Sequence, residues 1–360
     1  MDALEKSLCD FTGSTPLDQR FRSLFTIKGL AATSDQHMQR AISIISQAFS
    51  DDSALLKHEL AYVLGQLEDA RALPTLKKIL QDLSQDAMVR HEAAEAMGAI
   101  SDPSVLPILE QYRSDSDVSV RETCELAISK ISFDNSEEGQ ALKQSKAQAK
   151  LAEEQSGLGG VESAFKPIDP APAMTPAASK EAARSQADGV RYDASHVPLF
   201  QSTLLDTNLS LFERYRAMFA LRNVAHGGGD GAIQAVLALA RGLQDGSALF
   251  RHEICFVFGE LCHPASIPSM LHVLNDTKEH EMVRHEAAEA LGGIVEEGEH
   301  AANDSANDYT RVLDTLNKWA HDMDAPRVVR ESCIVALDEL AYNNDPTQFH
   351  RIETSTPVAA

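Results

Sequence analysis

A twelve-residue stretch occurs twice in this chain, as VRHEAAEAMGAI from Val89 and as VRHEAAEALGGI from Val283. Related stretches, LKHELAYVLGQL from Leu56 and FRHEICFVFGEL from Phe250, each begin 33 residues earlier. The two pairs are separated by 194 residues, so a whole half of the chain is duplicated. A period of 20 to 50 residues is typical of repeat architectures, in which each unit packs mainly on its neighbours.

Each repeat unit has the pattern of two helices. ARALPTLKKILQD carries apolar residues at helical spacing, and Pro74 is tolerated in an opening turn. The following DAMVRHEAAEAMGAI predicts a second helix, capped by Asp86 and with Gly98 near its end. Aromatic residues make up only 6% of the chain and alternating strand patterns are weak. The sequence therefore predicts an all-α fold, an α-solenoid of HEAT-like helical-pair repeats.

Composition divides the chain into two pseudo-symmetric halves joined by a long linker. We expect an N-terminal HEAT-repeat half over 1–133 and a C-terminal half over 196–345. The segment 134–195 is rich in Ala, Ser, Lys, Glu, Gln and Pro, which predicts a flexible linker. We expect a disordered tail over 346–360, and an insertion, EEGEHAANDSAND from Glu296, lengthens one loop.

The charge balance limits the possible partners. The 360 residues carry a formal net charge of −22, and no Lys/Arg stripe is present to neutralise phosphates, which argues against nucleic acid. No apolar run is long enough to span a membrane, and the N-terminus has no signal pattern. The five cysteines form no C-x-x-C pair and are expected to be reduced. We expect a cytoplasmic protein, a monomer, with a cationic partner or substrate.

Four His-Glu pairs stand in equivalent repeats, two pairs in each half. The last repeat of each half keeps the preceding arginine but reads RET or RES. Packing alone therefore does not require His-Glu at this position of the repeat. Neighbouring solenoid helices lie about 8–10 Å apart, which brings equivalent side chains towards one site. Two histidines and a carboxylate per half suit Fe(II) with open positions, and two facing halves would form a dinuclear site. The residues alone do not determine which metal is bound.

Other residues of the motif have less specific interpretations. The basic residues before the pairs are shared with the RET and RES repeats, so we expect them to stabilise the repeats: Lys57, Arg90, Arg251 and Arg284. Glu95 and Glu289 lie four residues beyond a histidine, on the same helix face. We expect them at the surface, the alternative being that they accept hydrogen bonds from the imidazoles.

Four His-Glu pairs in two HEAT halves, with HEAAEAMGAI and HEAAEALGGI in the second pairs, resemble the deoxyhypusine hydroxylase family. The resemblance implies a di-iron, oxygen-dependent monooxygenase that hydroxylates deoxyhypusine on eukaryotic translation initiation factor five A, completing hypusine. It implies two Fe²⁺ ions per chain and molecular oxygen as co-substrate. The implied ligands are His58, His91 and Glu92 for one iron and His252, His285 and Glu286 for the other. Glu59 and Glu253 would bind the amines of the substrate.

Two other hypotheses fit the repeats. A non-catalytic HEAT scaffold that binds a protein predicts no stoichiometric metal and tolerance of His91→Ala. A different dinuclear enzyme, such as a metal hydrolase, predicts zinc or manganese and no dependence on oxygen.

Overall fold

The structure is a computed structural model, and it describes residues 1–156, 167–175, 192–294 and 303–343. Within these ranges the chain is helical and contains no β-strand, as predicted. The helices of the N-terminal half are α1 (Asp2–Leu8), α2 (Leu17–Ala31), α3 (Asp35–Ala48), α4 (Ala54–Gln66), α5 (Leu73–Gln81), α6 (Ala87–Ile100), α7 (Leu106–Tyr112) and α8 (Val118–Asp134). Helix α9 (Glu137–Ser156) follows.

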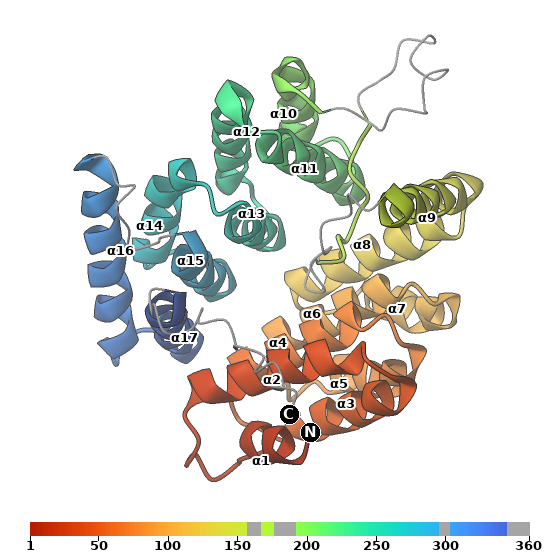
Figure 1. Cartoon of the computed structure of the whole chain (residues 1–360), viewed down its shortest axis with the longest axis vertical. Helices are drawn as coiled ribbons and strands as arrows, with labels where there is room; N and C mark the ends of the chain where they lie inside the picture. Colours follow the sequence, from red (N-terminus) through yellow and green to blue (C-terminus); the bar gives the residue numbers. More distant parts are fainter. Residues whose placement is uncertain (157–166, 176–191, 295–302, 344–360) are drawn as a thin grey trace, which may run out of the picture.

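The C-terminal half repeats the same order of helices. They are α10 (Val197–Leu205), α11 (Leu211–His226), α12 (Gly229–Arg241), α13 (Ala248–Leu261), α14 (Ile267–Asn275), α15 (Glu281–Ile294), α16 (Asn303–His321) and α17 (Arg327–Asn343). The two halves face each other in a ring (Figure 1). The even-numbered helices α4, α6 and α8 of one half and the odd-numbered α13, α15 and α17 of the other form the inner layer.

On α6 and α15, a buried arginine fastens the inner helix to the outer helix before it. Nε of Arg90 donates to the carbonyl of Leu80 at 3.1 Å, and Arg284 makes the same contact with Leu274 at 3.1 Å. Both guanidinium groups are buried, and each satisfies a carbonyl at the C-terminal end of an outer helix. Arg251 instead binds Glu279. The expectation that these arginines stabilise the repeats is confirmed by these contacts.

Small residues let the inner helices approach closely. A Cβ added to Gly65 of α4 would lie 2.7 Å from Cα of Ala96 on α6. At the equivalent junction in the other half, a Cβ on Gly259 of α13 would lie 3.4 Å from Cα of Ala290 on α15, and one on Gly292 of α15 would lie 3.0 Å from Cα of Ala336 on α17. Any side chain at Gly65 would therefore push α4 away from α6, and with it the histidines these helices carry.

Two equivalent seams close the ring. Helix α8 contacts α11 and α13 at one seam, and α17 contacts α2 and α4 at the other. At the first seam the Ser247 hydroxyl donates to Glu122 at 2.6 Å; at the second, the Ser53 hydroxyl donates to Glu331 at 2.7 Å. Both serines also cap the helices that follow them, α13 and α4. The repeat pattern does not predict these contacts, because they join residues of opposite halves.

The linker differs from expectation in its described parts. Residues 137–156 form α9, and residues 167–174, which we call the strap, pack against the inner helices. Ala171 of the strap is fully buried. A flexible linker was expected because this segment has few large apolar residues, but small residues and prolines can fill a narrow groove whose polar walls hold the backbone. The domain boundaries themselves stay predictions.

Two expectations fall wholly or partly outside the described residues. The tail over 346–360 is one of them. The insertion from Glu296 is described only from Asn303, where it begins α16.

Candidate metal centre

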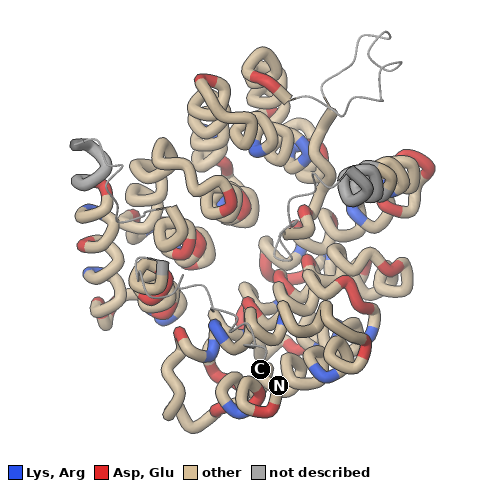
Figure 2. Tube along the Cα trace, in the orientation of Figure 1, with Lys and Arg blue, Asp and Glu red and all other residues tan. Residues whose placement is uncertain are grey.

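The four His-Glu pairs lie on the four central inner helices. His58 and Glu59 are on α4, and His91 and Glu92 are on α6. The other half places its pairs on α13 and α15, as His252 with Glu253 and His285 with Glu286. All eight side chains are buried, with exposed fractions of at most 8%. In Figure 2, acidic positions of the inner helices face one another across the ring.

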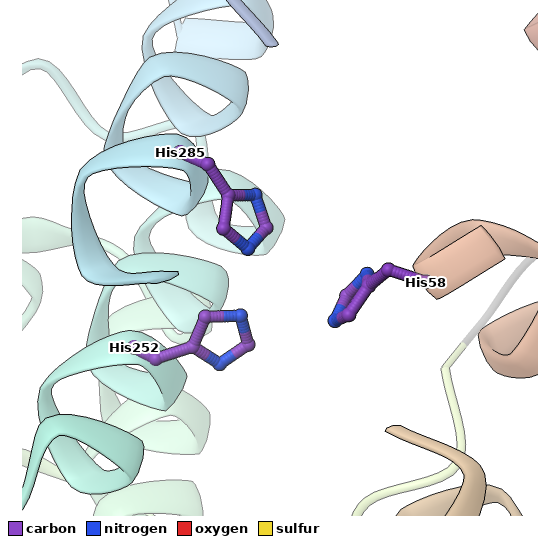
Figure 3. A group of neighbouring side chains, drawn as sticks. All are labelled: His58, His252 and His285. Carbon is purple, nitrogen blue, oxygen red and sulfur yellow. The ribbon is translucent and has the colours of Figure 1, made fainter. Parts of the chain in front are cut away.

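The four imidazoles form one cluster that joins the two halves. The ring centroids of His58 and His91 lie 5.5 Å apart, and those of His252 and His285 lie 5.3 Å apart. Between the two halves, the imidazole centroids of His58 and His285 lie 5.2 Å apart, and those of His91 and His252 lie 5.6 Å apart. Figure 3 shows the rings of His252 and His285 directed towards that of His58. The packing therefore brings histidines from opposite halves as close as histidines of one half.

Carboxylates complete this cluster. Oε2 of Glu92 lies 3.3 Å from Nε2 of His58, and Oε2 of Glu286 lies 3.2 Å from Nε2 of His252. Three groups of possible ligand atoms lie within 4.8 Å of one another: His58–His91–Glu92, His285–Glu286–Glu289 and His58–His252–His285. The first is one of the two predicted triads. In the second half Glu289, and not His252, groups with His285 and Glu286, while His252 groups with His285 and with His58 of the first half.

Burial shifts the protonation of these groups strongly. Burial, with the neighbouring histidines, lowers the pKa of His91 well below its usual value, and burial lowers the pKa of His252 to about 3. Burial would also lower the pKa of His58, but the carboxylates of Glu92 and Glu59 outweigh it, and the pKa is raised. Burial and nearby Glu289 raise the pKa of Glu286 well above its usual value. Such a group of buried carboxylates is costly to ionise without a cation among them.

The imidazole nitrogens are suited to metal ligation. Among the described residues, neither ring nitrogen of His91, nor Nδ1 of His252, nor Nε2 of His285 has a hydrogen-bond partner. Nε2 of His58 and of His252 each lie beside a carboxylate oxygen, at 3.3 and 3.2 Å, without the alignment of a hydrogen bond. Buried polar atoms are nearly always hydrogen-bonded, so a group of unpartnered nitrogens in one place requires an explanation. Neutral imidazoles and carboxylates at this spacing are the ligand set of a transition metal. The residues present therefore fit a metal centre.

Support for these ligands differs between the halves. Glu289 lies with Oε1 3.4 Å from Nδ1 of His285, and the same oxygen accepts a hydrogen bond from the Ser332 hydroxyl at 2.8 Å. The equivalent residues of the first half are Glu95 and Thr123. The Thr123 hydroxyl is buried without a partner among the described residues. The expectation that Glu289 and Glu95 lie at the surface is wrong, because Glu289 contacts His285 and Glu95 lines the central cavity.

A cavity of about 220 Å³ adjoins the cluster. Its walls combine carboxylates with apolar and aromatic side chains and one ammonium group, that of Lys130. The carboxylates are Glu59, Glu92, Glu95, Asp169, Glu253, Glu286 and Glu289, and the larger apolar groups are Phe25, Tyr62, Leu126, Ile168 and Phe256. The rings of Tyr62 and Phe256 meet edge to face, with centroids 6.0 Å apart. Such a cavity suits a long chain with cationic nitrogen and aliphatic carbon.

Known proteins resemble the chain over nearly its full length. HEAT repeats match residues 28–129 and 233–338. The deoxyhypusine hydroxylase of Neurospora crassa is 47% identical over 343 residues, which are 93% of this chain and 91% of that protein. The deoxyhypusine hydroxylase of Cryptococcus neoformans var. neoformans is 45% identical over 363 residues, covering 98% and 88%. The chain belongs to the deoxyhypusine hydroxylase family.

A solved structure agrees with this family assignment. The structure of human deoxyhypusine hydroxylase in complex with glycerol superposes with a TM-score of 0.70 at 44% identity, and the match covers 94% of this chain and 95% of the human one. The predicted solenoid of two HEAT halves is therefore the fold of a deoxyhypusine hydroxylase.

Other residues around the deoxyhypusine hydroxylase site were missed from the sequence. Tyr62 and Phe256 stand at equivalent positions 194 residues apart, and that regularity could have identified them as a pair. Ser332 and the strap had no comparable signal. No helix within the described ranges has the length and apolar character needed to cross a membrane.

Proposed function

We propose that this protein is a di-iron monooxygenase that hydroxylates the deoxyhypusine side chain of eukaryotic translation initiation factor five A. The observation that supports this most strongly is the cluster of four buried histidines with unpartnered nitrogens. It lies beside a carboxylate-lined cavity in a member of the deoxyhypusine hydroxylase family. The substrate side chain is a long aliphatic amine, which matches the combination of carboxylates and apolar side chains that line this cavity.

One iron would be held by His58, His91 and Glu92, and the other by His252, His285 and Glu286. Two ferrous ions bound here would supply the electrons that activate molecular oxygen for insertion of one oxygen atom into a C–H bond.

The protein residues have separate tasks around this chemistry. Glu59 and Glu253 would accept hydrogen bonds from the substrate ammonium groups, and their buried position strengthens such charge-assisted bonds. Tyr62 and Phe256 would exclude water and pack on the methylene groups. The cavity would therefore orient the side chain with a carbon, and not a nitrogen, beside the metals.

The deciding experiment is a mass measurement on the protein substrate. The purified protein, loaded with ferrous ion in the presence of a reductant, is incubated in air with the deoxyhypusine-bearing factor. We expect a gain of one oxygen atom, and no gain under nitrogen. Activity with zinc or manganese and no need for oxygen would favour a metal hydrolase instead.

Metal content gives a second, independent test. We expect two iron ions per chain, with a loss of iron in His58→Ala and in His285→Ala. His37→Ala is the matched control, because His37 is exposed and its hydrogen bonds within the described part of the chain go to Thr33 and Ser34 at the start of its own helix. Unchanged iron content in both site variants would contradict the ligand assignment and favour a non-catalytic scaffold.

The remaining proposals concern the partner, the cellular location and the oligomeric state of the protein. The acidic balance and the absence of a basic stripe support a protein partner and no nucleic acid. The five cysteines, all among the described residues, form no disulfide, which supports the cytoplasm as the location. We expect a monomer, because the two halves already supply both parts of the site.

A further inference from the structure

The strap is fastened to the C-terminal half by a buried arginine. Both carboxylate oxygens of Asp169 accept hydrogen bonds from the guanidinium of Arg222 on α11, each at 2.6 Å. This parallel, two-bond pairing is the strong geometry of arginine with a carboxylate. The backbone adds two further contacts: the Met174 amide donates to the Arg216 carbonyl at 2.8 Å, and Nε of Arg216 donates to the Pro172 carbonyl at 3.3 Å.

The other end of the strap reaches the N-terminal half. The Ile168 amide donates to Oε1 of Gln66, on α4, at 2.9 Å. Residues 167–170 of the strap, including Ile168 and Asp169, line the central cavity together with His58 and His252 of the candidate metal centre. The strap thus bridges the two halves and provides an apolar part of the cavity wall. Its prolines restrict the backbone, so little conformational entropy is lost in holding it there.

The strap breaks the pseudo-symmetry of the molecule. The position equivalent to Arg222, 194 residues earlier, is Lys28, whose ammonium lies 5.4 Å from the centroid of the Tyr62 ring. An ammonium lacks the two parallel N–H groups with which a guanidinium holds one carboxylate. The described residues therefore provide this guanidinium seat for the strap in the C-terminal half, where Arg222 binds Asp169.

We propose that the strap is the wall of the substrate pocket against which the aliphatic part of the amine side chain packs. This inference rests on the proposed function. Glu59, Glu253 and Ile168 all line this pocket, so the carboxylates would attract the nitrogens while the apolar side chain of Ile168 packs on the methylene groups. Asp169 also lines the pocket and is here a positioning residue that holds Ile168 in place, so Ile168→Gly, which keeps this carboxylate, is the variant that decides. The strap thereby favours a ligand whose nitrogens are separated by several methylene groups.

Two variants test this wall without unfolding the protein. Asp169→Asn removes the charge of the anchor, and Arg222 stays compensated because Glu260 also pairs with it at 2.9 Å. Ile168→Gly removes the wall itself and keeps the anchor. Glu5→Gln is the matched control, because it removes an exposed carboxylate paired with Arg40, on α3 in the outer layer.

The kinetic readout separates binding from chemistry. With the iron-loaded protein and the deoxyhypusine-bearing factor, we expect KM to rise about tenfold in Asp169→Asn and Ile168→Gly, with kcat changed less than about threefold. Iron content should stay at the wild-type value. Hydrogen exchange at the amides of Ile168 and Met174 should become faster in Asp169→Asn. Wild-type KM in Ile168→Gly would overturn the proposal.

A binding measurement tests the role of the strap independently of the proposed enzyme activity. We expect the metal-free protein to bind octamethylenediamine in calorimetry, and Ile168→Gly to bind it about tenfold more weakly than Glu5→Gln does. If wild-type protein fails to hydroxylate the factor but this difference is observed, the proposed function fails and the wall is supported. Equal diamine affinity in the two variants would contradict the wall, whatever the enzyme activity.

Discussion

Replacement of Ser332 by alanine should weaken iron binding in one half of the site. Ser332 is fully buried, and its hydroxyl donates to the Glu289 oxygen that lies 3.4 Å from Nδ1 of His285. Burial raises the pKa of Glu289, and the hydrogen bond from Ser332 works against that rise. Without the hydroxyl, Glu289 is more readily protonated at neutral pH and becomes a poorer acceptor for the imidazole N–H.

The magnitude follows from two estimates. A hydrogen bond to a charged group contributes about 1.5–3 kcal/mol when it is buried. Loss of a residue that orients a metal-binding histidine costs about 10–100-fold in metal affinity, or about 1.4–2.7 kcal/mol. The two ranges overlap, so we expect the affinity of one iron to fall at least about tenfold, with the other iron bound as in the wild type.

The assay is a titration of the metal-free protein with ferrous ion against a coloured chelator, without oxygen, at neutral pH. Thr123→Val is the matched control, because Thr123 is the equivalent residue of the other half and its hydroxyl has no partner among the described residues. It should leave both affinities within about twofold of the wild type, since no hydrogen bond is removed. Two unchanged affinities in Ser332→Ala, or equal losses in the two variants, would refute the reasoning.

Three further predictions concern the scaffold and the cluster. Ser53→Ala and Ser247→Ala each remove a helix cap and a contact across a seam, so each should lower the free energy of unfolding by about 2 kcal/mol, measured by chemical denaturation. A chelator should lower the Tm of the iron-loaded protein, and should lower that of His91→Ala much less, because bound metal stabilises only the folded state. Burial opposes ionisation of Asp115, but Arg90 outweighs it and holds the pKa of Asp115 below 3.8. Asp115→Asn should therefore lose stability relative to wild type at neutral pH, and the loss should shrink as the pH falls below 3.8, measured by Tm.

The fold was predictable because the sequence repeats itself. A duplicated helix pair can bury its apolar face only against its neighbours, so the period already implied a solenoid of two halves. The glycines and alanines that let α4 approach α6 are part of that period, as at Gly65 and Ala96. The position of the strap was not predictable, because it depends on Arg222 and Gln66, which come from different halves and lie far from it in the sequence.

The sequence predicted which residues form the candidate site, but it predicted less well which of them lie next to one another. Four His-Glu pairs in equivalent repeats indicated one shared cluster, and the structure brings all four histidines together. The assignment of one triad to each half treats the halves as separate units. The structure places His58 as close to His285 as to His91, because the ring closes across its centre. Periodicity states which residues are equivalent, but not how two halves meet.

The repeats that lack His-Glu explain how the halves meet. Glu122 and Glu331 occupy the column in which the other repeats carry histidine, directly after an arginine. On α8 and α17 this position faces the opposite half, and each glutamate accepts a hydrogen bond from the serine that caps the first His-Glu helix there. Two repeats of each half thus direct this position to the candidate metal centre, and the last repeat uses it to fix α13 or α4 of the opposite half. Because those serines stand five residues before His58 and His252, the seams set the positions of the histidines that face each other across the ring.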